Sequence, residues 1–199
     1  MTLLVLDSAS LWYRAYYGMP DTLLSPDCEP VNAVRGYFDM VSRLILQYKP
    51  SRVIAAIEGD WRPSWRVKLF AEYKANRVDD EGGEEEPDLL TPQIPIILEG
   101  LDALGIPVIG VDDFEADDII ATFVDRFGKG NEVLICTGDR DSFQLVTPDV
   151  TVLYPKKGVT ELARMTPEAV LEKYGLSPAQ YPDFAALRGD PSDNLPSIP

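Results

Sequence analysis

The residues that could do chemistry in this sequence are acidic, and they gather in a few short stretches. Single carboxylates occur at Asp7 and Glu58, and groups of them occur in the segments FEADD, TGDRD and GDPSDN. The sequence contains no histidine, which excludes a Ser-His-Asp triad, a Cys-His dyad and a histidine-ligated zinc site. Acid-base chemistry must therefore come from carboxylates, Lys, Tyr or metal-bound water.

These acids recur where strands are predicted to end. Short apolar runs predict strands over 3–6, 52–57, 106–111 and 132–136, and acids follow each run within a few residues. Parallel strands place their carboxyl ends along one edge of a sheet, where ligands bind. Nine candidate carboxylates would meet at that edge: Asp7, Glu58, Glu115, Asp117, Asp118, Asp139, Asp141, Asp190 and Asp193.

Carboxylates at this density repel one another. At about 4 Å and an effective dielectric near 20, each like-charged pair costs on the order of 4 kcal/mol, so cations must neutralise the group or some members must be protonated. Oxygen ligands without His or Cys select hard ions such as Mg²⁺ or Mn²⁺. The number of acids indicates two ions, which serve in-line phosphoryl displacement. For any one acid taken alone, a helix cap or a turn remains the plainer interpretation.

Residues 61–77 interleave positive charge with aromatic rings. This mixture suits phosphate contacts combined with base stacking, although a surface helix with its rings on the core would give the same pattern. The net charge of −15 argues against a polyanionic partner. However, 17 of the 33 acids remain, against 18 basic residues, once the nine candidate ligands and the seven acids in 79–88 are set aside. The rest of the chain is therefore about neutral, and the net charge does not exclude a polyanionic substrate.

Helices must hold these strands in place. Spacings of three and four predict an amphipathic helix over 34–48, and aromatic-rich 11–18 and basic 64–75 are also expected to be helical. Helix starts are predicted at Thr91-Pro92, at Asp112 or Asp113, at Thr166-Pro167 and at Ser177-Pro178. Residues two apart on a helix point in different directions, so a regular helix could not aim Glu115, Asp117 and Asp118 at one point. We therefore expect Glu115 to lie in an extended segment just before the helix.

Alternating strands and helices predict one α/β domain over 1–199 with a mainly parallel sheet. The acidic segment 79–88 is expected to be an exposed, mobile loop, within a linker-like excursion of the domain over 78–90. Two distant cysteines, no long apolar run and no basic leader predict a cytoplasmic protein without disulfides or a membrane partner.

Taken together, the segments LDSAS, DWRPSWR, YKANR, FEADDIIAT, TGDRDSFQLV and LRGDPSDNLP resemble the bacterial 5′ nucleases. These are the flap endonuclease or 5′→3′ exonuclease domains that are found at the N-terminus of DNA polymerase I and also occur as stand-alone actinobacterial proteins. The resemblance covers essentially the whole chain. It implies a PIN-like three-layer α/β/α fold with a helical arch or clamp insertion over about 62–95. It also implies a monomer that hydrolyses DNA near 5′ ends or flaps with the help of metal ions.

The resemblance also implies roles for single residues. The ligands of a first ion would be Asp7, Glu115, Asp117 and Asp118, and those of a second would be Asp139, Asp141, Asp190 and Asp193. Lys74 resembles the lysine that contacts the scissile phosphate, and Arg66 is expected to assist it. Tyr73 resembles a base-stacking residue. The DNA-binding set would be Arg62, Arg66, Tyr73, Lys74 and Arg77.

Two features depart from the family pattern. Glu58 stands where Asp is usual, so its contact could shift or be taken over by Asp60. The chain stops at LPSIP, where the family continues into a helix-hairpin-helix that binds a monovalent cation such as K⁺ and the duplex; residues 186–199 would be only its start. We therefore expect a C-terminally truncated member. A PIN-type ribonuclease and a catalytically weakened, structure-specific DNA-binding module remain alternatives.

Overall fold

The computed structural model describes residues 1–79, 82–83, 86–157 and 161–198. Its centre is a six-stranded sheet in the order β3-β2-β1-β4-β5-β6. Neighbouring strands run parallel from β3 to β5, and β6 pairs antiparallel with β5. The bounds are β1 Thr2–Asp7, β2 Arg52–Ala56, β3 Val108–Ile109, β4 Glu132–Cys136, β5 Val150–Lys157 and β6 Glu161–Met165. The expected mainly parallel sheet is confirmed.

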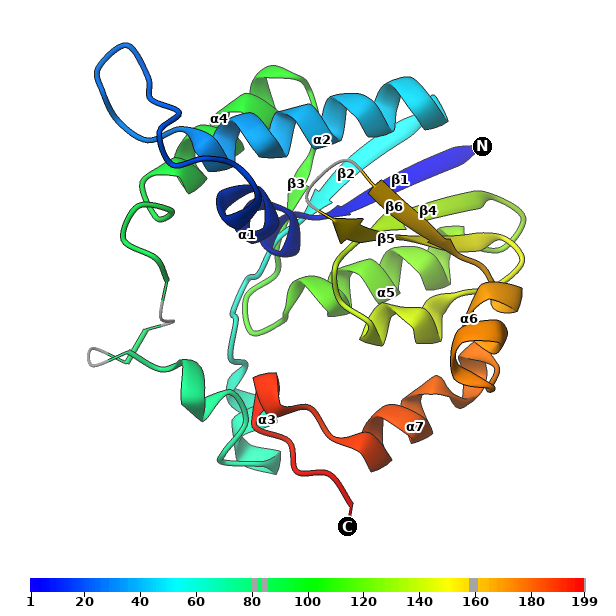
Figure 1. The fold of residues 1–199 in the computed structure, drawn as a ribbon. Helices are drawn as coiled ribbons and strands as arrows, with labels where there is room; N and C mark the ends of the chain where they lie inside the picture. Colours follow the sequence, from blue (N-terminus) through cyan, green and yellow to red (C-terminus); the bar gives the residue numbers. More distant parts are fainter. Residues whose placement is uncertain (80–81, 84–85, 158–160, 199) are drawn as a thin grey trace.

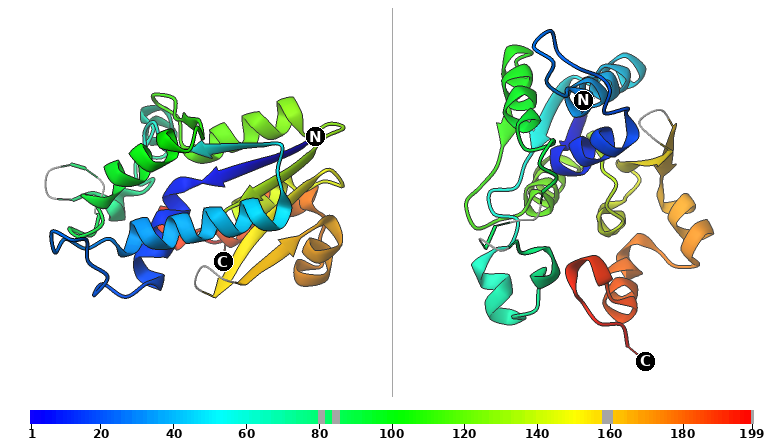
Figure 2. Two further views of the ribbon diagram at one scale, coloured as in Figure 1. Left: turned by 90° about the horizontal axis from the view of Figure 1, so that it is seen from above. Right: turned by 60° about the vertical axis from the view of Figure 1, so that its left-hand side comes forward.

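Helices cover both faces of this sheet (Figures 1 and 2). One face packs against α1 (Ser8–Gly18), α2 (Asn32–Tyr48) and α4 (Gln93–Ala103), and the other packs against α5 (Ala116–Phe127), α6 (Pro167–Tyr174) and α7 (Tyr181–Arg188). Strand β1 shows why two layers form: Leu4 and Leu6 enter the first core, whereas Leu3 and Val5 enter the second. Alternating side chains of a strand face opposite sides of the sheet, so an apolar strand needs cover on both. The three-layer α/β/α fold is confirmed.

Two of the predicted helix starts are confirmed. The Thr166 hydroxyl accepts a hydrogen bond from Ala169 N at 3.3 Å and caps α6. Ser177 forms a capping box with Gln180 at the start of a short 3₁₀ helix, Pro178–Gln180, that leads into α7. Both starts combine a hydroxyl cap with Pro at the first helical position, which is a strong local signal.

At the other two predicted starts, the helices are present but the predicted caps are wrong. Helix α4 begins after Pro92 without a side-chain cap, since the Thr91 hydroxyl donates to Glu86 instead. Helix α5 is capped by Glu115 rather than by Asp112 or Asp113, and the Asp118 carboxylate accepts from Glu115 N at 3.0 Å. This capping box satisfies the first turn of α5. Glu115 itself is extended, as predicted.

The predicted helix over 64–75 is only half present. Helix α3 spans Ser64–Leu69, and a 3₁₀ turn follows at Ala75–Arg77. Between them the chain turns inward: Tyr73 and Lys74 are buried, and Lys74 adopts a left-handed φ of 51°. Inward rotation of these two side chains is incompatible with a continuous surface helix.

The remaining expectations concern the third predicted strand, the acidic loop and the absence of a membrane-spanning helix. The strand predicted at 106–111 is reduced to two residues, and Pro107 at its start has no N–H to donate. Of the segment expected to be a mobile loop, 80–81 and 84–85 lie outside the described residues. Within the described part of the chain, no helix has both the length and the apolarity needed to span a membrane.

Candidate active site

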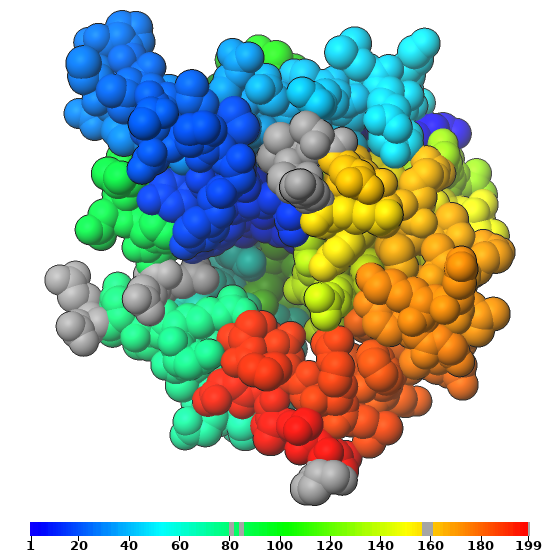
Figure 3. All heavy atoms as spheres, viewed as in Figure 1, coloured from blue at the N-terminus to red at the C-terminus, as the bar shows by residue number. Residues whose placement is uncertain are grey.

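The nine candidate carboxylates all line one cavity of about 1390 Å³ at the carboxyl edge of the sheet. Figure 3 shows the hollow between α1, the basic segment 61–77 and the C-terminal turn. The acids come from the ends of β1, β2 and β4, from the first turn of α5 and from the turn at 190–193. Segments far apart in sequence therefore meet as predicted from strand ends.

Asp7 lies at the floor of the cavity and is buried. One carboxylate oxygen accepts from Ser10 N at 3.2 Å, and the other accepts from the Thr137 hydroxyl at 2.5 Å. Burial raises the pKa of Asp7 to about 6 against the lowering effect of these hydrogen bonds, and the nearby charge of Asp139 raises it further. The side chain is held firmly while its charge remains poorly compensated.

Glu58, the residue that departs from the family pattern, still reaches the cavity. Its carboxylate accepts a hydrogen bond from Ala116 N, at the start of α5, at 2.7 Å. Burial raises the pKa of Glu58 to about 7, with smaller increases from Asp7 and Glu115. Asp60 also lines the cavity and accepts from Arg62 N. The longer side chain is therefore placed among the other acids.

Glu115 is surrounded by donors. Its carboxylate accepts from Tyr73 Oη at 2.7 Å and pairs with Arg66 and Lys74, each at 2.6 Å. Arg66 also pairs with Asp118 at 2.9 Å. Two of the four predicted ligands of the first ion are thus neutralised by the basic segment.

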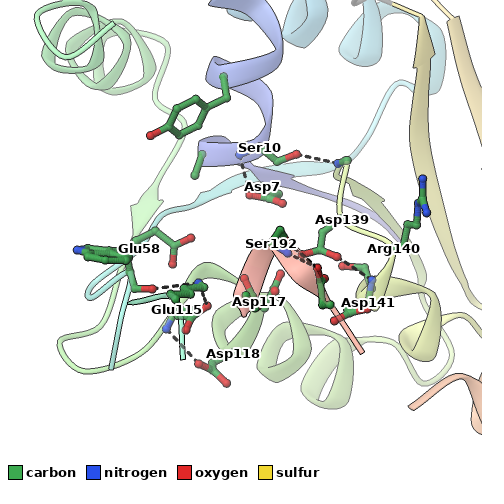
Figure 4. Close-up of a pocket in the computed structure, with 18 of the residues that line it drawn as sticks. Asp7, Ser10, Glu58, Glu115, Asp117, Asp118, Asp139, Arg140, Asp141 and Ser192 are labelled. Carbon is green, nitrogen blue, oxygen red and sulfur yellow. Dashed lines mark hydrogen bonds and ion pairs between the residues drawn. The ribbon is translucent and has the colours of Figure 1, made fainter. Parts of the chain in front are cut away.

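Asp117, Asp139 and Asp141 face the same hollow as Asp7 (Figure 4). Burial raises the pKa of Asp117 well above its usual range, and the charges of Asp139 and Asp7 add to this effect. Burial and the charge of Asp139 raise the pKa of Asp141 to about 6. The negative charge is therefore concentrated between β1, β4 and α5.

The C-terminal turn closes the cavity and is tied to the basic segment. Asp193 pairs with Arg77 at 2.6 Å, and its carbonyl oxygen accepts from Lys74 N at 3.0 Å. Asp190 accepts from Ser192 N and from the Ser192 hydroxyl. Figure 1 shows the two segments side by side below the sheet. Both acids line the cavity as predicted.

The donor chemistry of this cavity fits hard divalent cations. Among the described residues, no three Cys, Asp or Glu side chains already stand in an arrangement that would grip a metal ion. Asp7, Glu58 and Asp117 nevertheless have raised pKa values, and none of the ion pairs between described residues involves these three acids. Carboxylate oxygens are the ligands that Mg²⁺ and Mn²⁺ prefer, and within the described part of the chain these three are not already occupied by a cationic side chain.

The structure distinguishes among the predicted DNA-binding residues. Arg66, Tyr73, Lys74 and Arg77 line the cavity. Arg62 does not: its guanidinium donates to the backbone oxygens of Tyr73 and Ala71 and so holds the turn of the basic segment.

Sequence reasoning missed several residues of the site. Ser10 and Thr137 contact Asp7 directly, and Arg140 and Arg188 line the cavity. The available signal was their position inside LDSAS, TGDRD and LRGD, the segments that carry the acids.

The sheet order, the two helical layers and the acidic cavity define a PIN-like nuclease fold. Among solved structures, the chain is similar to the bacteriophage T5 flap endonuclease in a pseudo-enzyme-product complex with DNA and metal ions. The TM-score is 0.74 at 19% sequence identity, and the match covers 100% of this chain and 70% of that one. At this identity the likeness establishes the fold.

Sequence comparison establishes the family. Residues 2–175 match the family described as 5′-3′ exonuclease, N-terminal resolvase-like domain. The chain is 50% identical to a Streptomyces coelicolor 5′-3′ exonuclease over 203 residues, covering 98% of this chain and 67% of the relative. It is also 50% identical to Mycobacterium bovis DNA polymerase I over 200 residues, covering 100% of this chain and 21% of that protein. The chain therefore belongs to the 5′-3′ exonuclease family of phosphodiester hydrolases.

Proposed function

We propose that this chain hydrolyses DNA phosphodiester bonds near 5′ ends or flaps, with two Mg²⁺ or Mn²⁺ ions held by the carboxylate cavity. The observation that carries the proposal is the meeting, in one cavity, of the nine candidate acids with three basic side chains of segment 61–77: Arg66, Lys74 and Arg77. The names of the relatives support it, because one is a 5′-3′ exonuclease and a structural neighbour is a flap endonuclease with DNA and metal ions.

The acids would divide into two ligand groups. Asp7, Asp117 and Asp118, with Glu115, would hold one ion, and Asp139, Asp141, Asp190 and Asp193 would hold the other. Glu58 stands beside the first group, where Ala116 N fixes one of its oxygens. Two ions held in this way activate water and stabilise negative charge on the leaving oxygen.

Three basic side chains that line the cavity, Arg66, Lys74 and Arg77, form a basic wall that would bind the substrate phosphate. The Lys74 ammonium and the Arg66 guanidinium both lie 2.6 Å from Glu115 oxygens, at the edge of the acid cluster. When divalent ions neutralise the acids, these two cations would be free to neutralise the charge that develops on the transferred phosphate. Arg77, on the same wall, would bind an adjacent phosphate.

The decisive experiment uses a 5′-labelled flap substrate with Mg²⁺, Mn²⁺ or EDTA and resolves the product lengths. We expect metal-dependent products, and their lengths will separate stepwise removal of nucleotides from cleavage at the flap base. A matched RNA substrate tests the ribonuclease alternative. Flap binding without any product in either metal would instead support a DNA-binding module and refute the proposal.

A substitution inside the cavity provides a second test, and the same substitution at an exposed position provides its matched control. Asp139→Asn removes one charge at nearly constant shape and should lower cleavage by orders of magnitude while the circular dichroism spectrum stays unchanged. Asp125→Asn, at an exposed position of α5, should cleave like the unmodified protein. Near-normal turnover of Asp139→Asn in Mg²⁺ would contradict the assignment.

A further inference from the structure

We propose that Thr137 is a positioning residue that sets Asp7 and Asp139 in the geometry needed to bind metal ions. This inference rests on the proposed metal-dependent function. Thr137 is fully buried directly after β4, and its hydroxyl lies between two of the candidate ligands. The hydroxyl donates to Asp7 Oδ2 at 2.5 Å and accepts from Asp139 N at 2.9 Å.

The position of this hydroxyl in the sheet explains what it can do. The parallel pairing of β1 with β4 ends at Leu6 opposite Cys136. Asp7 is the last residue of β1 and Thr137 directly follows β4, so both lie one position beyond this last pair. The hydrogen bond between the Thr137 and Asp7 side chains links the two segments one residue beyond the last backbone pair. It therefore fixes the end of β1 relative to the end of β4.

The same hydroxyl organises the acids that follow β4. Because it accepts from Asp139 N, it holds the backbone of the turn, and Asp139 Oδ1 in turn accepts from Asp141 N at 2.7 Å. A hydroxyl has one proton to donate and lone pairs to accept with, so one Thr can serve both strands at once. An aliphatic side chain can do neither.

Ser10 locks the two turns from the other side. Its backbone N–H donates to Asp7 Oδ1, and its hydroxyl accepts from Gly138 N at 2.8 Å. Gly138 fits tightly there, since a Cβ at this position would lie 2.9 Å from Ser10 Oγ. Asp7 is thus held by one donor on each oxygen, and each carboxylate oxygen keeps a further lone pair for a ligand.

A purely structural role for Thr137 would be to cap the turn after β4. That role and the positioning role differ in one consequence. A structural residue changes the stability of the fold, whereas a positioning residue changes metal affinity in protein that is still folded. Removal of a partner that orients a metal ligand typically weakens metal binding by about 10- to 100-fold.

The test compares Thr137→Val, which keeps the shape and loses the hydroxyl, with Thr137→Ser, which keeps the hydroxyl. Each variant is titrated calorimetrically with MnCl₂ in the absence of DNA. We expect the Mn²⁺ dissociation constant of Thr137→Val to rise by about 10- to 100-fold and that of Thr137→Ser to stay close to the unmodified value. Thr151→Val controls for the loss of a buried Thr hydroxyl elsewhere, since Thr151 pairs with Leu134 on the sheet.

Cleavage kinetics add a second readout. Thr137→Val should need more Mn²⁺ for half-maximal cleavage, while its KM for flap DNA stays unchanged because the basic wall is untouched. Unchanged Mn²⁺ affinity in Thr137→Val, or equal impairment of the Val and Ser variants, would overturn the inference. If Thr137→Val does not fold, Thr137→Ala and Thr137→Ser form a second pair that differ only in the hydroxyl.

The outcomes separate this inference from the proposed function. If the unmodified chain binds Mn²⁺ but cleaves neither DNA nor RNA, the nuclease proposal fails, and the calorimetric comparison still decides the role of Thr137. If it cleaves flap DNA and Thr137→Val behaves like it, only the inference fails. Absence of Mn²⁺ binding by the unmodified chain would refute both.

Discussion

Replacing Glu58 with Gln should stabilise the metal-free protein, although it removes a candidate ligand. The substitution keeps the shape of the side chain and a carbonyl oxygen that can accept from Ala116 N, as Glu58 does at 2.7 Å. It removes a negative charge that burial and the neighbouring acids make unfavourable. The metal-free fold should therefore gain stability, and the size of the gain should depend on pH.

The structure sets the direction and size of this effect. The pKa of Glu58 rises from 4.5 to about 7 on folding, so the folded state binds the proton more tightly than the unfolded state. The stabilising contribution of the proton is complete below pH 4.5 and is lost as pH rises through 7. At 1.36 kcal/mol per pKa unit, Glu58→Gln should gain about 1 kcal/mol at pH 5.5 and up to about 3 kcal/mol at pH 8.

The assay is urea unfolding in EDTA at the two pH values, followed by circular dichroism. Glu172→Gln, at an exposed position of α6, is the matched control and should show little gain at either pH. Addition of Mg²⁺ should reduce the advantage of Glu58→Gln, because only the unmodified protein keeps the full set of acids. A gain that is equal at both pH values, or a loss of stability at pH 8, would refute the electrostatic reasoning.

Three further predictions concern metal, phosphate binding and helix capping. Mg²⁺ at 100 times its dissociation constant should raise the free energy of unfolding by about 2.7 kcal/mol, measured by urea unfolding with and without EDTA, and no shift would count against a metal site. Arg77→Ala should weaken binding of flap DNA and reduce the salt dependence of that binding, measured by fluorescence anisotropy in Mg²⁺ with Asp139→Asn also present to suppress cleavage, because Mg²⁺ is expected to release Arg77 from Asp193; an unchanged salt dependence would remove Arg77 from the DNA-binding set. Thr166→Ala should cost about 1 kcal/mol because it removes the cap of α6, whereas Thr91→Ala should cost less because Thr91 caps no helix; equal losses in thermal unfolding would contradict this difference.

The acids could be placed from the sequence because their position depends on backbone topology. Asp7 and Asp139 follow apolar runs whose strands are short, buried and parallel, and parallel strands end along the same edge of a sheet. Helix α6 could also be predicted, since Thr166 and Pro167 carry a local signal that needs no tertiary contact. For α6 the controlling forces act within a few residues, whereas for the acids short apolar runs are enough to predict the long-range parallel pairing.

Other features depended on contacts that no local pattern reveals. Glu115 rather than Asp113 caps α5, and Gly59 lies so close to Val111 that a Cβ at position 59 would be 1.9 Å from the Val111 oxygen. The close approach of these two chain segments sets the path into α5. Likewise, the helix predicted over 64–75 ends early because Tyr73 and Lys74 turn inward to reach Glu115.

That inward turn explains the least predictable feature of the site, which is the division of its acids into two electrostatic groups. Glu115, Asp118 and Asp193 pair with Lys74, Arg66 and Arg77. Asp7 and Asp117 instead have raised pKa values, because burial and like charges outweigh the favourable contacts. Because cations on the basic segment already occupy part of the predicted ligand set, divalent ions would have to displace them. In our proposal, the same displacement would release the basic side chains to bind a phosphate.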